Sequence, residues 1–184
     1  GGPKTKNAKQ PNSFVYRFVP ADKTDLSKGG KLQALQVLDA YAKPIVFHDG
    51  QQDADILALE QKLLHAYGNE LPTRWVTLKE TAAGATETFD SNTLAKAANA
   101  TPFKRPENGQ FRPGTDFKEF YFTATGDTNA KTEAGTEYGG FGGVFRVTQD
   151  APSDDKGSIG IVFRGDVTKT GLDNLSFLDD KQLL

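Results

Sequence analysis

Two stretches of the sequence decide the fold: "FVYRFVPADKTDLSKGGKLQAL" at residues 14–35 and "GVFRVTQDAPSDDKGSIGIVF" at residues 143–163. Each starts with an aromatic–Arg–apolar run that alternates as a strand does. Each then passes through a loop of Pro, Asp, Lys and Gly and returns as a second strand-like run. Both stretches therefore predict antiparallel hairpins with long loops. The likeness between them is either coincidental or the trace of an internal repeat, as in the blades of a β-propeller.

Further strand patterns lie between and after these hairpins, separated by loops rich in Gly, Asp and Thr. Counting both hairpins, we expect strands at 13–19, 31–38, 44–50, 73–81, 117–123, 142–148 and 158–164. Trp75, in the middle of one of these strands, is expected in the core.

Helical spacing of apolar residues is confined to two segments. Residues 53–67 predict a helix with Ile56 on its buried side and His65 on its solvent side. Residues 91–100 are rich in Ala and predict a short helix with Ser91 as its N-cap. The predicted fold class is therefore all-β, mainly antiparallel, with short helical insertions.

The number of strands is too small for a complete propeller. A blade takes roughly 40–50 residues and a propeller needs at least four blades, so the chain accounts for about two blades. Residues 1–12 predict a linker or surface tail, and residues 13–184 part of a single β-propeller domain. The sequence contains no Met, and we expect it to be a piece of a longer chain. An open apolar edge should then be covered by the remainder of its own polypeptide or by another chain.

Composition excludes several classes of function. The chain has 22 basic and 24 acidic residues and a net charge of −2, which argues against a nucleic-acid partner. No apolar run approaches the roughly 18 residues that a membrane span requires. There is no Cys, so the chain contains neither a disulfide nor a thiolate site.

The main candidate site is Arg105-Pro106-Glu107, within "FKRPENGQFRPGTDFKEFYF". Pro106 favours an extended backbone at Arg105, and residues two apart in an extended chain point to the same side. Arg105 and Glu107 would then face one cavity, with Lys104 on the opposite side. A guanidinium matches two phosphate oxygens, and a carboxylate beside it suits a hard cation. The alternative is an ordinary loop of solvated charges.

A second candidate is the loop at residues 125–143, "TGDTNAKTEAGTEYGGFGG". It offers four oxygen donors for calcium: Asp127, Asn129, Glu133 and Glu137. The EF-hand spacing fails, because Lys131 stands where a third oxygen ligand is needed. A flexible hairpin loop is the alternative. The glycines of "YGGFGG" precede a strand and so do not predict a nucleotide site.

The remaining motifs point to no chemistry. His48 precedes Asp49-Gly50, a turn signal, and is expected in a loop. Two histidines without cysteine are too few for a zinc site. No nucleophile elbow of the serine hydrolases is present.

Several segments together resemble a known family. These are "KLQAL", "IVFHDGQQDADIL", "TRWVTL", "ATPFKRPENGQFRPGTDFKEFYFTATGDTNA", "YGGFGGVFRVTQ" and "FRGDVTKTGLDNLSF". They resemble the PhoX-like alkaline phosphatases, secreted bacterial β-propeller proteins. The resemblance extends from Asn12 to Leu184, and the "RPEN" stretch is its most specific part.

The resemblance implies a metal-dependent phosphatase that hydrolyses phosphate esters with calcium and iron in a central channel. It implies that Arg105 is the catalytic, substrate-binding residue and that Glu107 is a metal ligand. It also implies a periplasmic or extracellular location. The iron-binding cysteine of the family has no counterpart here, because the chain has no Cys. The alternative function is a non-catalytic propeller that serves as an envelope or binding scaffold.

Overall fold

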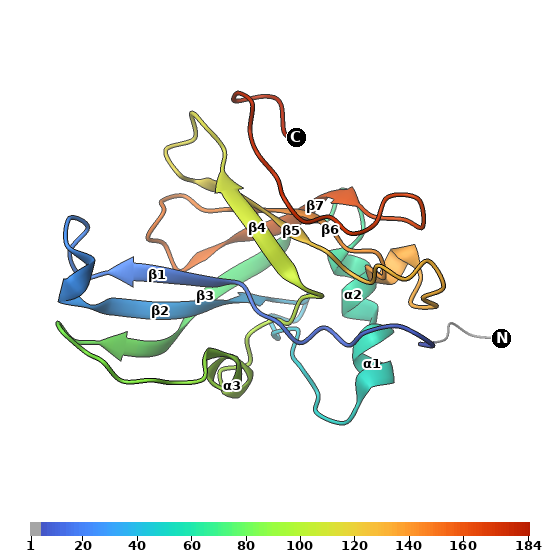
Figure 1. The fold of residues 1–184 in the computed structure, drawn as a ribbon, viewed down its shortest axis with the longest axis horizontal. Coiled ribbons are helices and arrows are strands. Elements are labelled where there is room, and N and C mark those ends of the chain that lie inside the picture. The colour runs from blue at the N-terminus through green and yellow to red at the C-terminus, as the bar shows by residue number, and fades with distance from the viewer. Residues whose placement is uncertain (1–4) are drawn as a thin grey trace.

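The computed structural model describes residues 5–184 (Figure 1). In this range it has seven strands: β1 (Tyr16–Pro20), β2 (Gly30–Val37), β3 (Leu71–Thr81), β4 (Pro106–Phe111), β5 (Glu119–Ala124), β6 (Gly143–Thr148) and β7 (Lys156–Arg164). Its helices are short: α1 (Gln52–Ile56), α2 (Leu59–Leu64) and α3 (Ser91–Ala97), with 3-10 turns at Leu26–Lys28 and Thr136–Tyr138.

The strands form one sheet in the order β1-β2-β3-β7-β6-β5-β4, and every neighbouring pair is antiparallel. The β3–β7 ladder is short and joins only Leu71–Arg74 to Lys156–Ile159. The sheet therefore has a three-stranded part and a four-stranded part with a narrow junction. It curls until β4 passes near the start of β1 (Figure 1). There, Ser13 and Phe103 exchange two backbone hydrogen bonds of 3.3 and 2.7 Å.

This architecture confirms the predicted fold class: a mostly antiparallel β protein with short helices, consistent with part of a propeller. Both predicted hairpins form, as β1–β2 and as β6–β7. The strand predicted at 44–50 is wrong, because only an isolated bridge between Leu38 and Pro44 forms there. Strand β4 was not expected, because its sequence is interrupted by Pro, Asn and Gly.

The single helix predicted over 53–67 is wrong as well. Ala58, the N-cap of α2, has an extended ψ of 141°, and it separates α1 from α2. Because of the break, α2 has a different orientation from the one that a continuous helix would give it. His65, expected on the surface, is only 6% exposed.

The largest core cluster lies within the curl of the sheet and is rich in aromatic rings. Phe103, Phe122 and Phe145 contact one another with ring centroids 5.2–5.5 Å apart. Trp75 belongs to the same cluster, as predicted. Burying side chains of this size contributes about 2–3 kcal/mol each, and this core holds the two parts of the sheet together.

Two glycines bring the long β5–β6 connection back onto itself. Gly126 has a φ of 70° and Gly142 a φ of 74°, a region that favours glycine. A Cβ at either position would meet backbone atoms at 2.1 or 2.0 Å. These glycines therefore serve close backbone packing beside the start of β4.

The described part of the predicted tail lies against the protein, while residues 1–4 are outside the described residues. The Lys9 backbone N–H donates to Asp127 Oδ1 at 2.9 Å, and the Gln10 side chain donates to Asp55 Oδ2 at 2.8 Å. The tail thereby connects α1 with the loop that follows β5. Within residues 5–184, no helix combines the length and the apolar character needed to cross a membrane.

Candidate functional site

The backbone of Arg105 is not extended as predicted. Its φ is 56°, in the left-handed region that side chains with a Cβ rarely adopt. The segment just after β5 explains why: Thr125 N–H donates to the Arg105 carbonyl at 2.9 Å, and Gly126 N–H donates to the Lys104 carbonyl at 3.1 Å. These tertiary hydrogen bonds override the local preference of a residue that precedes proline.

The side chains of Arg105 and Glu107 nevertheless contact each other, because of a register shift and not because of a regular extended backbone. The register of β4 against β5 shifts between Pro106 and Gly109, as it does at a β-bulge, and Glu107 lies in this shift. Arg105 Nη2 donates to Glu107 Oε1 at 3.3 Å, and the hydroxyl of Thr125 lies 3.5 Å from the same oxygen. Bulges re-aim side chains and are common beside active sites.

This Arg–Glu pair is accessible to a ligand. The Arg105 side chain is 45% exposed and that of Glu107 is 36% exposed. An exposed ion pair contributes about 0–1 kcal/mol to stability, so stability alone gives little reason for it. A half-exposed guanidinium retains N–H donors that can pair with the oxygens of an oxyanion.

Lys104, predicted on the side opposite Arg105 and Glu107, is buried. Its side chain is 7% exposed, and Nζ lies 2.9 Å from Oδ2 of Asp127, whose side chain is 1% exposed. Burial lowers the pKa of Lys104, and the hydrogen bond and charge of Asp127 oppose that shift. Lys104 is therefore part of the buried framework, and its replacement would disturb the residues around it.

The structure does not assemble the calcium ligands considered for the loop at residues 125–143. Asp127 is fully engaged with Lys104, the Lys9 N–H and the Thr132 hydroxyl. Among residues 5–184, no group of three or more His, Asp or Glu side chains could hold a metal ion. At the candidate site, Glu107 provides a carboxylate, and these residues do not complete a metal centre around it.

His48, predicted in a loop, lies between β2 and α1 and contacts Asp55. Its Nδ1 is 2.6 Å from Asp55 Oδ1, and its backbone N–H donates to Oδ2 at 2.9 Å. The Asp55 carboxylate thus closes the loop that leads into α1, and this contact is structural.

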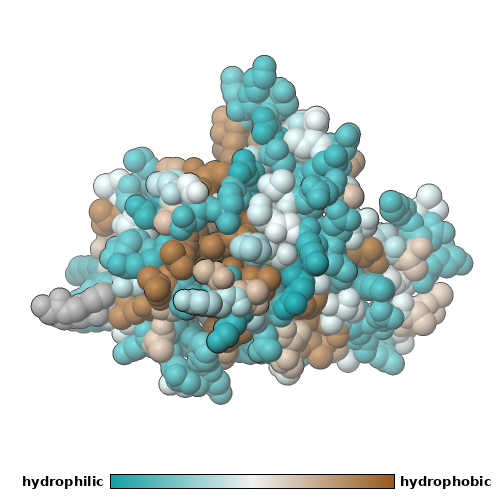
Figure 2. Space-filling model, turned by 180° about the vertical axis from the view of Figure 1, so that it is seen from behind, coloured by the Kyte–Doolittle hydropathy of each residue, from teal (hydrophilic) through white to brown (hydrophobic). Residues whose placement is uncertain are grey.

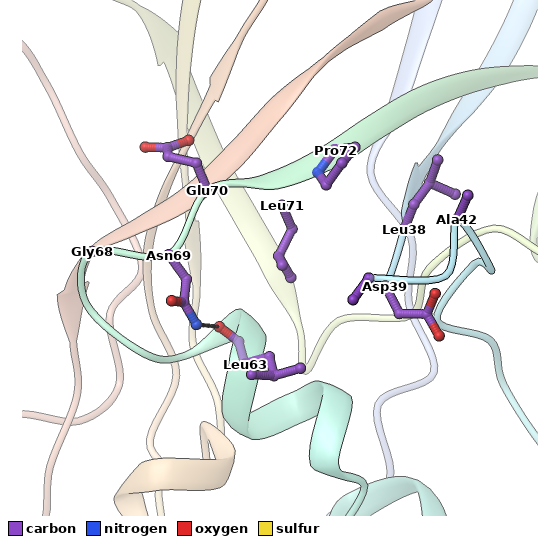
Figure 3. Close-up of a pocket in the computed structure, with 10 residues that line it drawn as sticks. Leu38, Asp39, Ala42, Leu63, Gly68, Asn69, Glu70, Leu71 and Pro72 are labelled. Atoms are coloured by element: carbon purple, nitrogen blue, oxygen red, sulfur yellow. Dashed lines mark hydrogen bonds between the residues drawn. The ribbon is translucent and has the colours of Figure 1, made fainter.

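A cavity of about 490 Å³ opens between the end of β2, the end of α2 and the start of β3 (Figure 3). Its polar groups are already engaged. Asn69 Nδ2 donates to the Leu63 carbonyl at 3.0 Å, Asp39 accepts from the backbone of its own turn, and Glu70 is paired with Arg146. The cavity therefore offers no free catalytic grouping.

A larger groove of about 650 Å³ lies between β1 and β4, the two edge strands. Its walls are mostly aromatic and aliphatic and include Phe18, Trp75, Phe111 and Phe117. The reverse face of the molecule also carries a hydrophobic area among hydrophilic residues (Figure 2). Sequence reasoning anticipated an open apolar face but not its place between these two edges.

The fold and the Arg–Glu pair define the class: an antiparallel β protein, consistent with part of a propeller, with an exposed guanidinium paired with a carboxylate. Residues 5–172 match the model of the family alkaline phosphatase PhoX. This match covers most of the chain, and the chain belongs to that family. Neither the curated proteins nor the solved structures contain a match to it.

Proposed function

We propose that this chain carries the phosphate-binding part of a phosphatase that hydrolyses phosphate monoesters. Membership of the alkaline phosphatase PhoX family supports a phosphatase function in general. The observation that carries the residue assignment is the accessible contact between Arg105 Nη2 and Glu107 Oε1 at 3.3 Å. Arg105 is proposed as the catalytic residue that contacts the substrate phosphate.

The chemistry follows from the two side chains. The guanidinium of Arg105 offers parallel N–H donors that match two phosphate oxygens and stabilise the charge that builds up during transfer. Glu107 lies close enough to orient the guanidinium before substrate binds. The Thr125 hydroxyl lies 3.5 Å from the same carboxylate oxygen.

Glu107 is also proposed to provide a metal ligand, with calcium and iron as the metals. When bound, such cations polarise phosphoryl oxygens. Carboxylate oxygen suits calcium. The described residues supply no further cluster of ligands, and the chain has no Cys to bind iron. The proposal therefore extends to Glu107 alone among the residues of this chain.

The wider setting is proposed on the same grounds. Residues 13–184 would be part of a single propeller domain, closed by the remainder of the same polypeptide or by another chain. The location would be periplasmic or extracellular.

The test is hydrolysis of a chromogenic phosphate monoester by the full-length protein with calcium. Arg105→Ala should reduce kcat/KM about tenfold or more, because it removes a charge-assisted contact of about 1.5–3 kcal/mol. Glu107→Gln should reduce activity further by removing a charged ligand. Lys118→Ala is the matched control, because Lys118 is an exposed cation of the loop that joins β4 to β5.

The second candidate is a non-catalytic propeller that acts as an envelope or binding scaffold. The observation that favours it is the lack of a three-residue metal cluster among residues 5–184. If the wild-type protein releases no phosphate above the protein-free blank, the scaffold function replaces the enzyme. If it does, but Arg105→Ala and Glu107→Gln match its turnover, the assignment of these two residues is wrong.

A further inference from the structure

The conformation of Arg105 is unfavourable, and the hydrogen bonds from Thr125 and Gly126 can hold it only if the backbone around Lys104 is itself fixed. A residue with a Cβ in the left-handed region crowds its own backbone, and such residues persist only where the surroundings hold them. Arg105 combines this conformation, φ 56°, with a proposed functional side chain.

Asp127 pairs with Lys104, the residue before Arg105. Its carboxylate accepts hydrogen bonds from Lys104 Nζ at 2.9 Å, the Thr132 hydroxyl at 3.2 Å and the Lys9 N–H at 2.9 Å. Its backbone is held on both sides as well, by the Gly140 carbonyl at 2.8 Å and the Thr170 hydroxyl at 2.7 Å. Asp127 is therefore a rigid anchor.

Lys104 connects Asp127 with the backbone next to Arg105. Its ammonium is tied to Asp127, while its carbonyl accepts from Gly126 N–H at 3.1 Å. On the other side of Arg105, Pro106 pairs with Ala124 in the sheet. The backbone thus has fixed points immediately before and after Arg105, and the left-handed turn joins them.

We propose that the buried Lys104–Asp127 pair is a positioning element that imposes the left-handed conformation on Arg105 and so directs its guanidinium to Glu107. The role of Arg105 in phosphate binding rests on the proposed function. The link between the buried pair and the backbone of Arg105 does not.

The first experiment tests whether residue 105 is held in the left-handed conformation by comparing the melting temperatures of glycine and alanine variants. Glycine tolerates a positive φ and alanine does not, so Arg105→Gly should melt about 2–4 °C above Arg105→Ala. When Lys104→Met and Asp127→Asn are added to both, the glycine advantage should vanish or reverse. An undiminished advantage in that background overturns the proposal. Should the combined variants fail to fold, Asp127→Asn alone takes their place and must still reduce the advantage.

The second experiment measures KM and kcat separately in the full-length enzyme. The Lys104→Met/Asp127→Asn protein should have a KM raised about tenfold. The single variant Lys104→Arg keeps a cation that can pair with Asp127, so its KM should stay close to that of the wild type. Partial unfolding alone would lower the apparent kcat and leave KM unchanged. Lys31→Met is the control, because it breaks the exposed Lys31–Glu80 pair on the β2–β3 ladder.

The two proposals fail in distinguishable ways. If Arg105→Ala leaves KM unchanged, phosphate binding by Arg105 is wrong, and the glycine–alanine comparison still decides the positioning role. If Arg105→Ala raises KM but removal of the Lys104–Asp127 pair does not, positioning by that pair is wrong.

Discussion

The imidazole of His65 lies inside the protein at the end of α2. Its Nδ1 is 2.7 Å from the Gln61 carbonyl, and its ring meets the edge of Phe145 with centroids 5.3 Å apart. A Cβ at Gly139 would come within 2.0 Å of Nε2, so the enclosure is tight. Burial, opposed by the Gln61 hydrogen bond, lowers the pKa of His65 to about 4.

This burial makes stability depend on pH. The unfolded chain takes up a proton at His65 below about pH 6.5, whereas the folded protein does so only near pH 4, so stability falls as pH drops through this window. Urea unfolding at pH 7 and pH 4.5 should show a loss of about 2–3 kcal/mol in the wild type that His65→Gln does not share. Equal losses in both proteins would contradict the assignment.

At the scale of elements, α3 is held at its start by Asp90. The Asp90 carboxylate accepts from the backbone N–H groups of Asn92 at 2.9 Å and Thr93 at 3.3 Å. The sequence predicted Ser91 as the cap. The one-residue error arises because Asp and Ser are both good N-caps and stand side by side.

Removal of this cap should weaken α3 and the small core that Ala95 forms beneath it. Asp90→Ala is expected to lower the free energy of unfolding by about 1 kcal/mol, as measured by urea titration at neutral pH. Thr88→Ala, an exposed change in the same segment, should alter it by less than about 0.5 kcal/mol. Similar values for the two variants would show that the cap contributes nothing.

The whole molecule is a curled sheet that closes at one end and stays open at the other. The bridge between Ser13 and Phe103 closes it, and the aromatic groove between β1 and β4 is the opening. Phe111 and Phe117 stand at this opening with rings 5.5 Å apart and exposed fractions of 42% and 65%. An exposed apolar area beside unpaired strand edges indicates a surface that binds another protein or an apolar ligand.

The groove should therefore bind an apolar dye. Anilinonaphthalene sulfonate should fluoresce with the native protein, and Phe111→Ser with Phe117→Ser should remove most of the signal because both rings line the groove. Tyr41→Ser is the control, since Tyr41 is 83% exposed but lies outside the groove. A signal unaffected by the two Phe changes would place the dye elsewhere.

Local patterning was sufficient for most of the sheet. Alternation of apolar and polar residues identified the two hairpins and the strand around Trp75, because the two-residue period is a property of each segment alone. The composition of "RPEN" singled out Arg105 and Glu107. The sequence by itself thus determined the fold class and the residues that compose the candidate site.

Tertiary structure decided how those residues are placed. The left-handed turn at Arg105, the burial of Lys104 against Asp127 and the enclosure of His65 all depend on partners distant in the chain. Strand β4 forms despite its Pro and Gly because β5 supplies its hydrogen-bond partners. A non-glycine residue in the left-handed region costs about 1–3 kcal/mol, and several tertiary hydrogen bonds of about 1 kcal/mol each together offset this cost.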